Sequence, residues 1–162
     1  GESLHREYSA LSENFKKVLL GMDKRLRLIN QIALEAFTGE YQTRLQTDRV
    51  SGAAFQNNTD LYLIRRGTAD IIGKGPSGDV KLFSLGDGDV FGKIPFMAFG
   101  HEPISAVVMT SEDFDAELID SHLLQNEYEK LSPTFKNFVI SSATNISMTT
   151  KLFYQLLGQG PS

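Results

Sequence analysis

Hydrophobic residues in the first forty positions recur every three or four residues, which is the spacing of one face of a helix. This stripe consists of Leu4, Tyr8, Leu11, Phe15, Val18, Met22, Leu26, Ile29, Ala33 and Ala36. Gly21 interrupts it, so two helices that meet near residues 21–23 and one long helix are both compatible with the pattern. Gly39 is expected to end the segment, because glycine readily adopts the left-handed conformation after a last helical turn. Residues 1–40 are therefore predicted to form an N-terminal helical segment.

The pattern changes to short apolar runs separated by turn residues between positions 41 and 122. The runs predict strands at 61–64, 69–72, 80–83, 104–109 and 116–119. Glycine, proline and aspartate gather at 73–79 and 86–89 and indicate turns. Many short strands at this spacing are typical of a jelly roll or small barrel. We therefore expect a mainly β fold with flanking helices, its β-roll lying within residues 41–122.

The helical period returns in residues 123–162. Leu123 and Leu124 begin a short helical stretch, and Pro133 is suited to the first turn of a long helix that ends at Gly158. No internal repeat and no second domain is apparent.

The long helix carries a stripe of large apolar residues: Phe135, Val139, Ile146, Phe153 and Leu156. Only Lys136 and Lys151 are charged between Pro133 and Gly158. A monomer that exposed this stripe would carry a large apolar patch, so we expect a homodimer built on this helix. The alternative is that the stripe packs on the roll or on the N-terminal helices of its own chain.

Composition and charge narrow the classes of function. The 162 residues are 41% hydrophobic and 22% charged, as in one ordinary globular domain, and contain no cysteine. The net charge of −4 argues against a nucleic-acid binder, and no apolar run is long enough for a membrane span. We expect a cytoplasmic protein that binds neither nucleic acid nor membrane. A local basic group is interpreted as a solvated helix face, with a phosphate or membrane contact as the alternative: Lys16, Lys17, Lys24, Arg25 and Arg27.

Three segments resemble the cyclic-nucleotide-binding family, which includes catabolite-activator-type regulators. Residues 61–67 are similar to an apolar strand that ends two residues before a glycine. Residues 85–92 (LGDGDVFG) resemble the turn into the family's phosphate-binding cassette, and residues 103–106 (PISA) resemble its end. The resemblance covers roughly residues 22–157 and implies a β-roll between N-terminal helices and a long C-terminal helix.

The resemblance also implies a pocket whose two main ligand-binding side chains are missing. In the family, a glutamate after the Phe-Gly pair binds the ribose hydroxyl and an arginine pairs with the cyclic phosphate. Lys93 and Ile104 occupy these positions here. Loss of the charge-assisted bonds of the arginine should weaken binding by about two to four decades. The candidate pocket residues are Phe91, Gly92, Lys93, Ile94, Ile104, Ser105 and Ala106.

The segment after Lys93 is unusually apolar. Phe96, Met97 and Phe99 are expected to close the core of the roll; alternatively they fill the former pocket, or the pocket accepts an apolar ligand. Lys93 is expected to be partly exposed or paired with Asp87 or Asp89, because an unpaired buried ammonium is costly.

Enzymatic functions find no support in the sequence. His5, His101 and His122 lie in different elements, so a metal triad is not expected, and the chain has no candidate nucleophile. We therefore predict a non-enzymatic regulatory or sensory module without a cofactor, which acts through contacts with an unknown protein partner. The alternative is a switch that binds a cyclic nucleotide or other small anion through an altered cassette at Gly92, Lys93, Ser105 and Ala106.

Overall fold

A computed structural model describes residues 2–41, 52–55, 59–76, 78–97 and 107–158. The helices are α1 (Glu2–Ala10), α2 (Glu13–Thr38), α4 (Ser121–Glu129) and α5 (Pro133–Gly158). The strands are β1 (Ala53–Ala54), β2 (Leu61–Arg66), β3 (Ala69–Gly75), β4 (Gly78–Leu85), β5 (Val90–Gly92), β6 (Val107–Thr110) and β7 (Asp115–Ile119).

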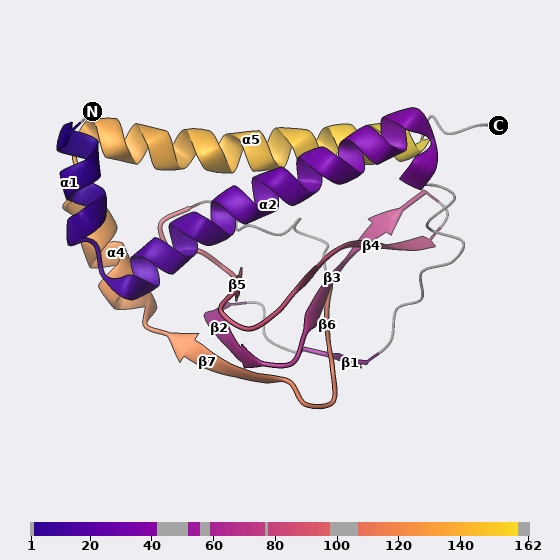
Figure 1. Cartoon of the computed structure of the whole chain (residues 1–162), viewed down its shortest axis with the longest axis horizontal. Helices are drawn as coiled ribbons and strands as arrows, with labels where there is room; N and C mark the ends of the chain where they lie inside the picture. Colours follow the sequence, from indigo (N-terminus) through magenta and orange to yellow (C-terminus); the bar gives the residue numbers. More distant parts are fainter. Residues whose placement is uncertain (1, 42–51, 56–58, 77, 98–106, 159–162) are drawn as a thin grey trace.

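The strands form two antiparallel sheets that together make the roll. One sheet has the order β1-β6-β3-β4 and the other the order β5-β2-β7. The long helices α2 and α5 lie on the same side of these strands, and the short helices α1 and α4 lie together at one end (Figure 1). Segments from the two ends of the chain therefore form one helical layer over the roll.

The predicted architecture is confirmed, with one correction to its class. Strands occupy the expected runs. The predicted 73–79 turn lies in the β3–β4 hairpin but is shorter than expected, since β3 extends to Gly75 and Gly75 pairs with Gly78. The expected strand at 104–109 is described from Val107 onward. The helices contain more residues than the strands, so the description "mainly β" was too loose. The reason is the length of α2 and α5, each of 26 residues.

The N-terminal helices break at Ser12 and not at Gly21. The Ser12 side chain accepts a hydrogen bond from the backbone N–H of Phe15, which caps the start of α2. Gly21 is buried inside α2, where a glycine costs only about 1 kcal/mol relative to alanine. The helix ends as predicted at Gly39, whose φ of 87° is left-handed.

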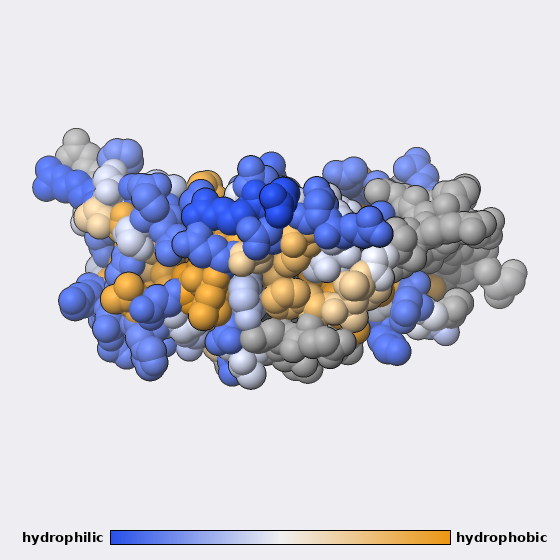
Figure 2. Space-filling model, turned by 90° about the horizontal axis from the view of Figure 1, so that it is seen from below, coloured by the Kyte–Doolittle hydropathy of each residue, from blue (hydrophilic) through white to orange (hydrophobic). Residues whose placement is uncertain are grey.

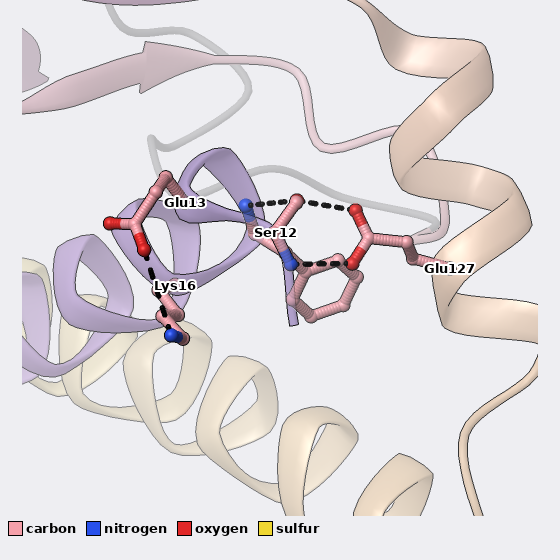
Figure 3. A network of polar contacts seen from close by, with 5 residues as sticks. Ser12, Glu13, Lys16 and Glu127 are labelled. Atoms are coloured by element: carbon pink, nitrogen blue, oxygen red, sulfur yellow. Dashed lines mark hydrogen bonds and ion pairs between the residues drawn. The ribbon is translucent and has the colours of Figure 1, made fainter. Parts of the chain in front are cut away.

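The helices form two helical hairpins, α1–α2 and α4–α5. The short helix of each hairpin caps the start of the long helix of the other. The Glu127 carboxylate of α4 accepts hydrogen bonds from the backbone N–H of Ser12 (2.9 Å) and from its hydroxyl (Figure 3). In return, the Glu7 carboxylate of α1 accepts from the N–H (2.9 Å) and hydroxyl (2.5 Å) of Ser132. We call these two contacts the reciprocal clasp. It satisfies donors that a helix start otherwise leaves unpaired.

The apolar stripe of α5 is buried within its own chain, which corrects the predicted dimer surface. Phe135, Val139, Ile146 and Phe153 are at most 5% exposed, and Leu156 is partly buried. The stripe faces α2, with which α5 makes its main contact, and the hydrophobic clusters that join the helices to the roll. The packing alternative is therefore correct for these residues, and they cannot be the exposed surface of a monomer.

Other faces of the molecule carry exposed apolar residues. On α5 these are Phe138, Ile140, Met148 and Leu152. Figure 2 shows hydrophobic residues gathered in the middle of the face opposite the long helices, and the strands expose Val107 and Leu118. Among the described residues, none of the helices combines the length and apolarity that crossing a membrane requires.

Candidate ligand cassette

The turn that leads into the candidate cassette is fixed by hydrogen bonds from several sides. Asp89 accepts the backbone N–H of Gly86 through its carboxylate (2.8 Å). Its own carbonyl accepts the N–H of Ile64, and Gly88 donates to the carbonyl of Ile64, both at 2.9 Å. Gly88 has a φ of 89°, which favours glycine. The turn is therefore held against the middle of the roll.

Two consecutive basic residues of α2 hold the same turn from the helical side. Lys24 Nζ lies 2.7 Å from the Asp89 carboxylate. Arg25 is 0% exposed, and its guanidinium donates to the Val90 carbonyl at 2.5 Å and lies 5.6 Å from the Phe83 ring centroid. The buried guanidinium thereby gains charge-assisted bonding where desolvation is expensive. The start of β5 is fastened directly to α2.

The first residues of the cassette are turned toward the β2 strand. Gly92 has a φ of 114°, and a Cβ there would lie 2.2 Å from the Asp60 carbonyl oxygen. The backbone N–H of Lys93 donates to that same oxygen at 3.0 Å. The Lys93 side chain is exposed. The amide that could contribute to an anion nest at this point is therefore already bonded within the protein.

Phe91 points into a cluster of aromatic rings and does not line an open surface. It is 1% exposed and its ring centroid lies 5.3 Å from Phe55, 5.6 Å from Tyr62 and 6.0 Å from Phe114. Phe55 follows β1, Tyr62 lies in β2 and Phe91 lies in β5. Phe114 precedes β7. The cluster joins the two sheets, so this candidate pocket residue is a core residue of the roll.

The apolar segment after Lys93 packs where the helices meet one sheet of the roll. The Phe96 ring stacks on Phe15 of α2 (5.3 Å, 9° between planes) and on Tyr128 of α4 (4.5 Å, 3°). Ile94 and Met97 are buried in a hydrophobic cluster that contains residues of the helices and of β2, β5 and β7. Met97 therefore lies in a core that the roll shares with the helices, and Phe96 packs against the same cluster. Phe99 lies outside the described residues.

The structure brings together only part of the predicted site. Phe91 and Ile94 are buried, Gly92 forms the bend and Lys93 is exposed, as expected. Asp89, one of the two partners suggested for Lys93, instead pairs with Lys24. The remaining candidates lie outside the described residues: Ile104, Ser105 and Ala106.

Sequence reasoning missed the part that α2 plays. It assigned Arg25 to a solvated basic face, whereas Arg25 is the most deeply buried charged residue described. The signal was its spacing: Val18, Met22, Arg25 and Ile29 follow the four-three-four period of a buried face.

A second contact joins the roll to the other long helix. A Cβ added to Gly73 of β3 would lie 1.8 Å from the Tyr154 hydroxyl oxygen of α5, so only glycine permits this approach. That hydroxyl is buried and has no hydrogen-bond partner among the described residues. Burial raises the pKa of Tyr154, because its charged form is disfavoured away from water.

The described part of the chain holds no cluster of three or more histidine, aspartate or glutamate residues suited to a metal ion.

No protein-family model matches the sequence, and no curated protein matches it. Solved structures provide the comparisons. The sensor domain of the transcriptional regulator DNR from Pseudomonas aeruginosa is 12% identical with a TM-score of 0.44, over 78% of this chain and 91% of that chain. A cyclic nucleotide-binding domain from Methylobacillus flagellatus is 18% identical with a TM-score of 0.42, over 69% and 66%.

A larger protein is also similar over part of its length. The cAMP-bound form of the EAL enzyme Bd1971 is 16% identical with a TM-score of 0.48, over 65% of this chain and 27% of that chain. The chain thus spans about a quarter of the length of that enzyme. At these identities the likeness concerns the fold alone.

Proposed function

We propose that this chain is a non-enzymatic regulatory module that keeps a cyclic-nucleotide-binding-like roll, does not bind cAMP or cGMP in the usual way, and acts through protein contacts. The observation that carries the proposal is the state of Lys93. Its side chain is exposed, and its backbone N–H is bonded to Asp60. The residue in the family's glutamate position therefore supplies no acceptor for a ribose, and its amide is already used.

The polar bonding of the described cassette is consistent with this proposal. Besides the Lys93 amide, the N–H of Met97 donates to the Ile94 carbonyl at 3.3 Å. Pro95 has no N–H at all. A phosphate needs several aligned donors at the start of such a segment, and each amide that is engaged or absent removes one.

The packing of Phe96 supports a role for this residue in coupling the cassette to the helices. Its ring is stacked between a residue of α2 and a residue of α4, so a shift of the cassette would strain both hairpins together. We propose that the module communicates between the cassette and the helical layer through this ring. A partner that binds the helices would thereby sense the arrangement of the cassette.

The exposed face of α5 is the contact surface that this proposal assigns to a partner protein or a second copy. Phe138 and Met148 are 59% and 63% exposed, and no acidic residue lies on the helix. This face replaces the buried stripe as the location of the proposed homodimer. Met148→Glu should leave the fold intact and abolish any dimer detected by light scattering at tens of micromolar. A dimer unaffected by this change would refute the assignment.

The alternative is an anion switch, and the exposed Lys93 ammonium is the observation that favours it. Calorimetric titration with cAMP, cGMP and inorganic phosphate separates the two functions. We expect no dissociation constant below about 10 μM, which corresponds to roughly −7 kcal/mol. A tighter constant for either nucleotide would refute the proposal, and one for phosphate alone would establish the alternative.

A restoring variant sharpens the titration. Lys93→Glu with Ile104→Arg reinstates the two side chains of the family pattern and should recover measurable cAMP binding if they were the missing elements. A matched control, Lys151→Glu with Leu152→Arg, makes the same kinds of change on α5, where both residues are exposed. Recovery in the control variant would show that the gain is not specific to the cassette.

A further inference from the structure

The two ends of the helical layer repeat one another in sequence. Residues 4–16 and 124–136 share the pattern L-x-x-E-Y-x-x-L-S-x-x-F-K. The identical pairs are Leu4 and Leu124, Glu7 and Glu127, Tyr8 and Tyr128, Leu11 and Leu131, Ser12 and Ser132, Phe15 and Phe135, and Lys16 and Lys136. The repeat corrects the expectation that the chain contains none.

The repeat extends to local structure. Each copy consists of a nine-residue helix followed by a 26-residue helix. Each serine accepts a hydrogen bond from the N–H of the phenylalanine three residues later, at 3.2 Å in the first copy and 3.1 Å in the second. Each lysine ammonium lies over the tyrosine ring of its own copy, at 5.7 Å and 5.6 Å from the centroid. The hairpins α1–α2 and α4–α5 are therefore two versions of one unit.

The two units are joined as in a two-fold symmetric interface. In the reciprocal clasp, the glutamate of each unit accepts from the serine of the other, and both N–H contacts measure 2.9 Å. An isologous interface has this property: if residue i contacts residue j, then j contacts i. Every hairpin consequently carries both halves of the clasp, the carboxylate and the helix start.

This arrangement specifies what fits the face of α4–α5 that α1–α2 covers, namely a helical hairpin with the same motif. We propose that a second copy of the chain supplies it by exchanging its N-terminal hairpin, so that Glu7 of one copy caps Ser132 of the other and the reverse. The bonds of α2 to the roll, from Lys24 and Arg25, move with the hairpin and are remade in the other copy.

Concentration decides between the closed monomer and the exchanged dimer, because the clasp itself is the same in both. Within one chain the covalent connection gives the hairpin an effective concentration on the order of millimolar. Exchange is therefore expected when protein refolds near that concentration, and the closed form when it refolds at about 10 μM. This inference does not depend on the proposed function, since it involves no ligand of the cassette.

The absence of cysteine from the sequence allows a direct test. Arg6 and Thr134 are exposed neighbours of Glu7 and Ser132, so Arg6→Cys in one preparation and Thr134→Cys in another leave the clasp in place. The two variants are unfolded together in urea, refolded at about 1 mM, diluted, and treated with a short bis-maleimide. We expect a cross-linked heterodimer of the two variants, and its yield should fall at least tenfold after refolding at about 10 μM.

Two outcomes would overturn the proposal. One is the absence of the heterodimer at both concentrations while a double variant, with both cysteines in one chain, cross-links internally. The other is cross-linking of Thr134→Cys chains only to one another, which would show that α4–α5 hairpins pair directly. As a further check, Glu7→Gln with Glu127→Gln should lower the melting temperature of both forms and leave the yield of heterodimer unchanged, since both forms contain the clasp. Glu13→Gln, which changes a carboxylate outside the clasp, should affect neither.

Discussion

The two helical hairpins of this chain begin alike and then differ. Both start with the same motif, the same serine cap and the same contact of a lysine ammonium with a tyrosine ring. The beginnings of the two hairpins are joined by the reciprocal clasp. Beyond them, α2 is rich in charge and buries Arg25 against the roll, whereas α5 has only Lys136 and Lys151. The position in α5 that corresponds to Arg25, 120 residues later, is the exposed Asn145.

The shared and the divergent parts of the two hairpins have different structural roles. The shared first turns hold the helical layer together. The divergent parts determine what each long helix contacts: α2 fastens the turn into the cassette, while α5 presents an apolar outer face. Phe96 connects both units to the cassette. Variants at corresponding positions should therefore have unequal effects where the hairpins differ and similar effects where they agree.

The largest inequality is expected at the corresponding positions 25 and 145. Arg25→Ala should lower the free energy of unfolding by about 3 kcal/mol, because it leaves a cavity and an unpaired carbonyl at Val90. Asn145→Ala, on the exposed face of α5, should change it by no more than about 0.5 kcal/mol. Urea denaturation of the two variants measures both values. Equal effects would show that α2 is not specialised for the roll.

The second test concerns Phe96, whose ring lies between the two helical hairpins. Phe96→Ala should cost about 2 kcal/mol, because it removes two stacked contacts and partly buried apolar area. Phe138→Ala is the matched control, since Phe138 is 59% exposed and should cost about 0.5 kcal/mol or less. If Phe96→Ala were as mild as its control, the cassette would not be coupled to the helices through this ring.

A stabilising change is expected where α5 meets β3. Tyr154→Phe removes a buried hydroxyl that has no partner among the described residues, and it keeps the ring that packs beside Gly73. The free energy of unfolding should rise by about 1 kcal/mol. Thermal denaturation followed by circular dichroism is sufficient to detect the shift, and a lower melting temperature would contradict the described contact.

The smallest effect is expected from the clasp at acidic pH. The hydrogen bonds from the hydroxyl and N–H of Ser132 lower the pKa of Glu7 from its ordinary 4.5. A lowered pKa in the folded state contributes stability that is present above 4.5 and is lost as the pH falls through the folded value. Glu7→Gln should therefore lower the melting temperature at pH 7 and reduce its dependence on pH below 4.5, with little change for the control Glu112→Gln. Unchanged acid dependence in Glu7→Gln would refute this contribution.

The sequence predicted elements well where local patterns determine them. The turn at 86–89, the stop at Gly39 and the start at Pro133 all follow from residue preferences within a few positions. The turn expected at 73–79 was too long, because β3 runs to Gly75 and β4 starts at Gly78. Prediction failed where distant segments decide the outcome. The pairing of Asp89 depends on Lys24, and the burial of the α5 stripe depends on α2.

The candidate site was predictable only in part for the same reason. Substitution of the family's two ligand-binding positions was visible at Lys93 and Ile104, and exposure of Lys93 followed from the cost of burying its charge. That Phe96 packs on the helices could not be inferred, because its two stacking partners, Phe15 and Tyr128, are far from it in sequence. The repeat is weak as a sequence signal, because its copies share scattered positions and lie 120 residues apart.

The most direct test of whether the cassette binds cAMP is amide hydrogen exchange at Lys93, measured by NMR with and without the nucleotide. A concentration of 1 mM cAMP is about a hundredfold above the 10 μM limit. The hydrogen bond to Asp60 predicts that this amide is protected in the free protein and that the nucleotide leaves its exchange rate unchanged. An amide that exchanges freely alone and becomes protected when cAMP is added would contradict the account.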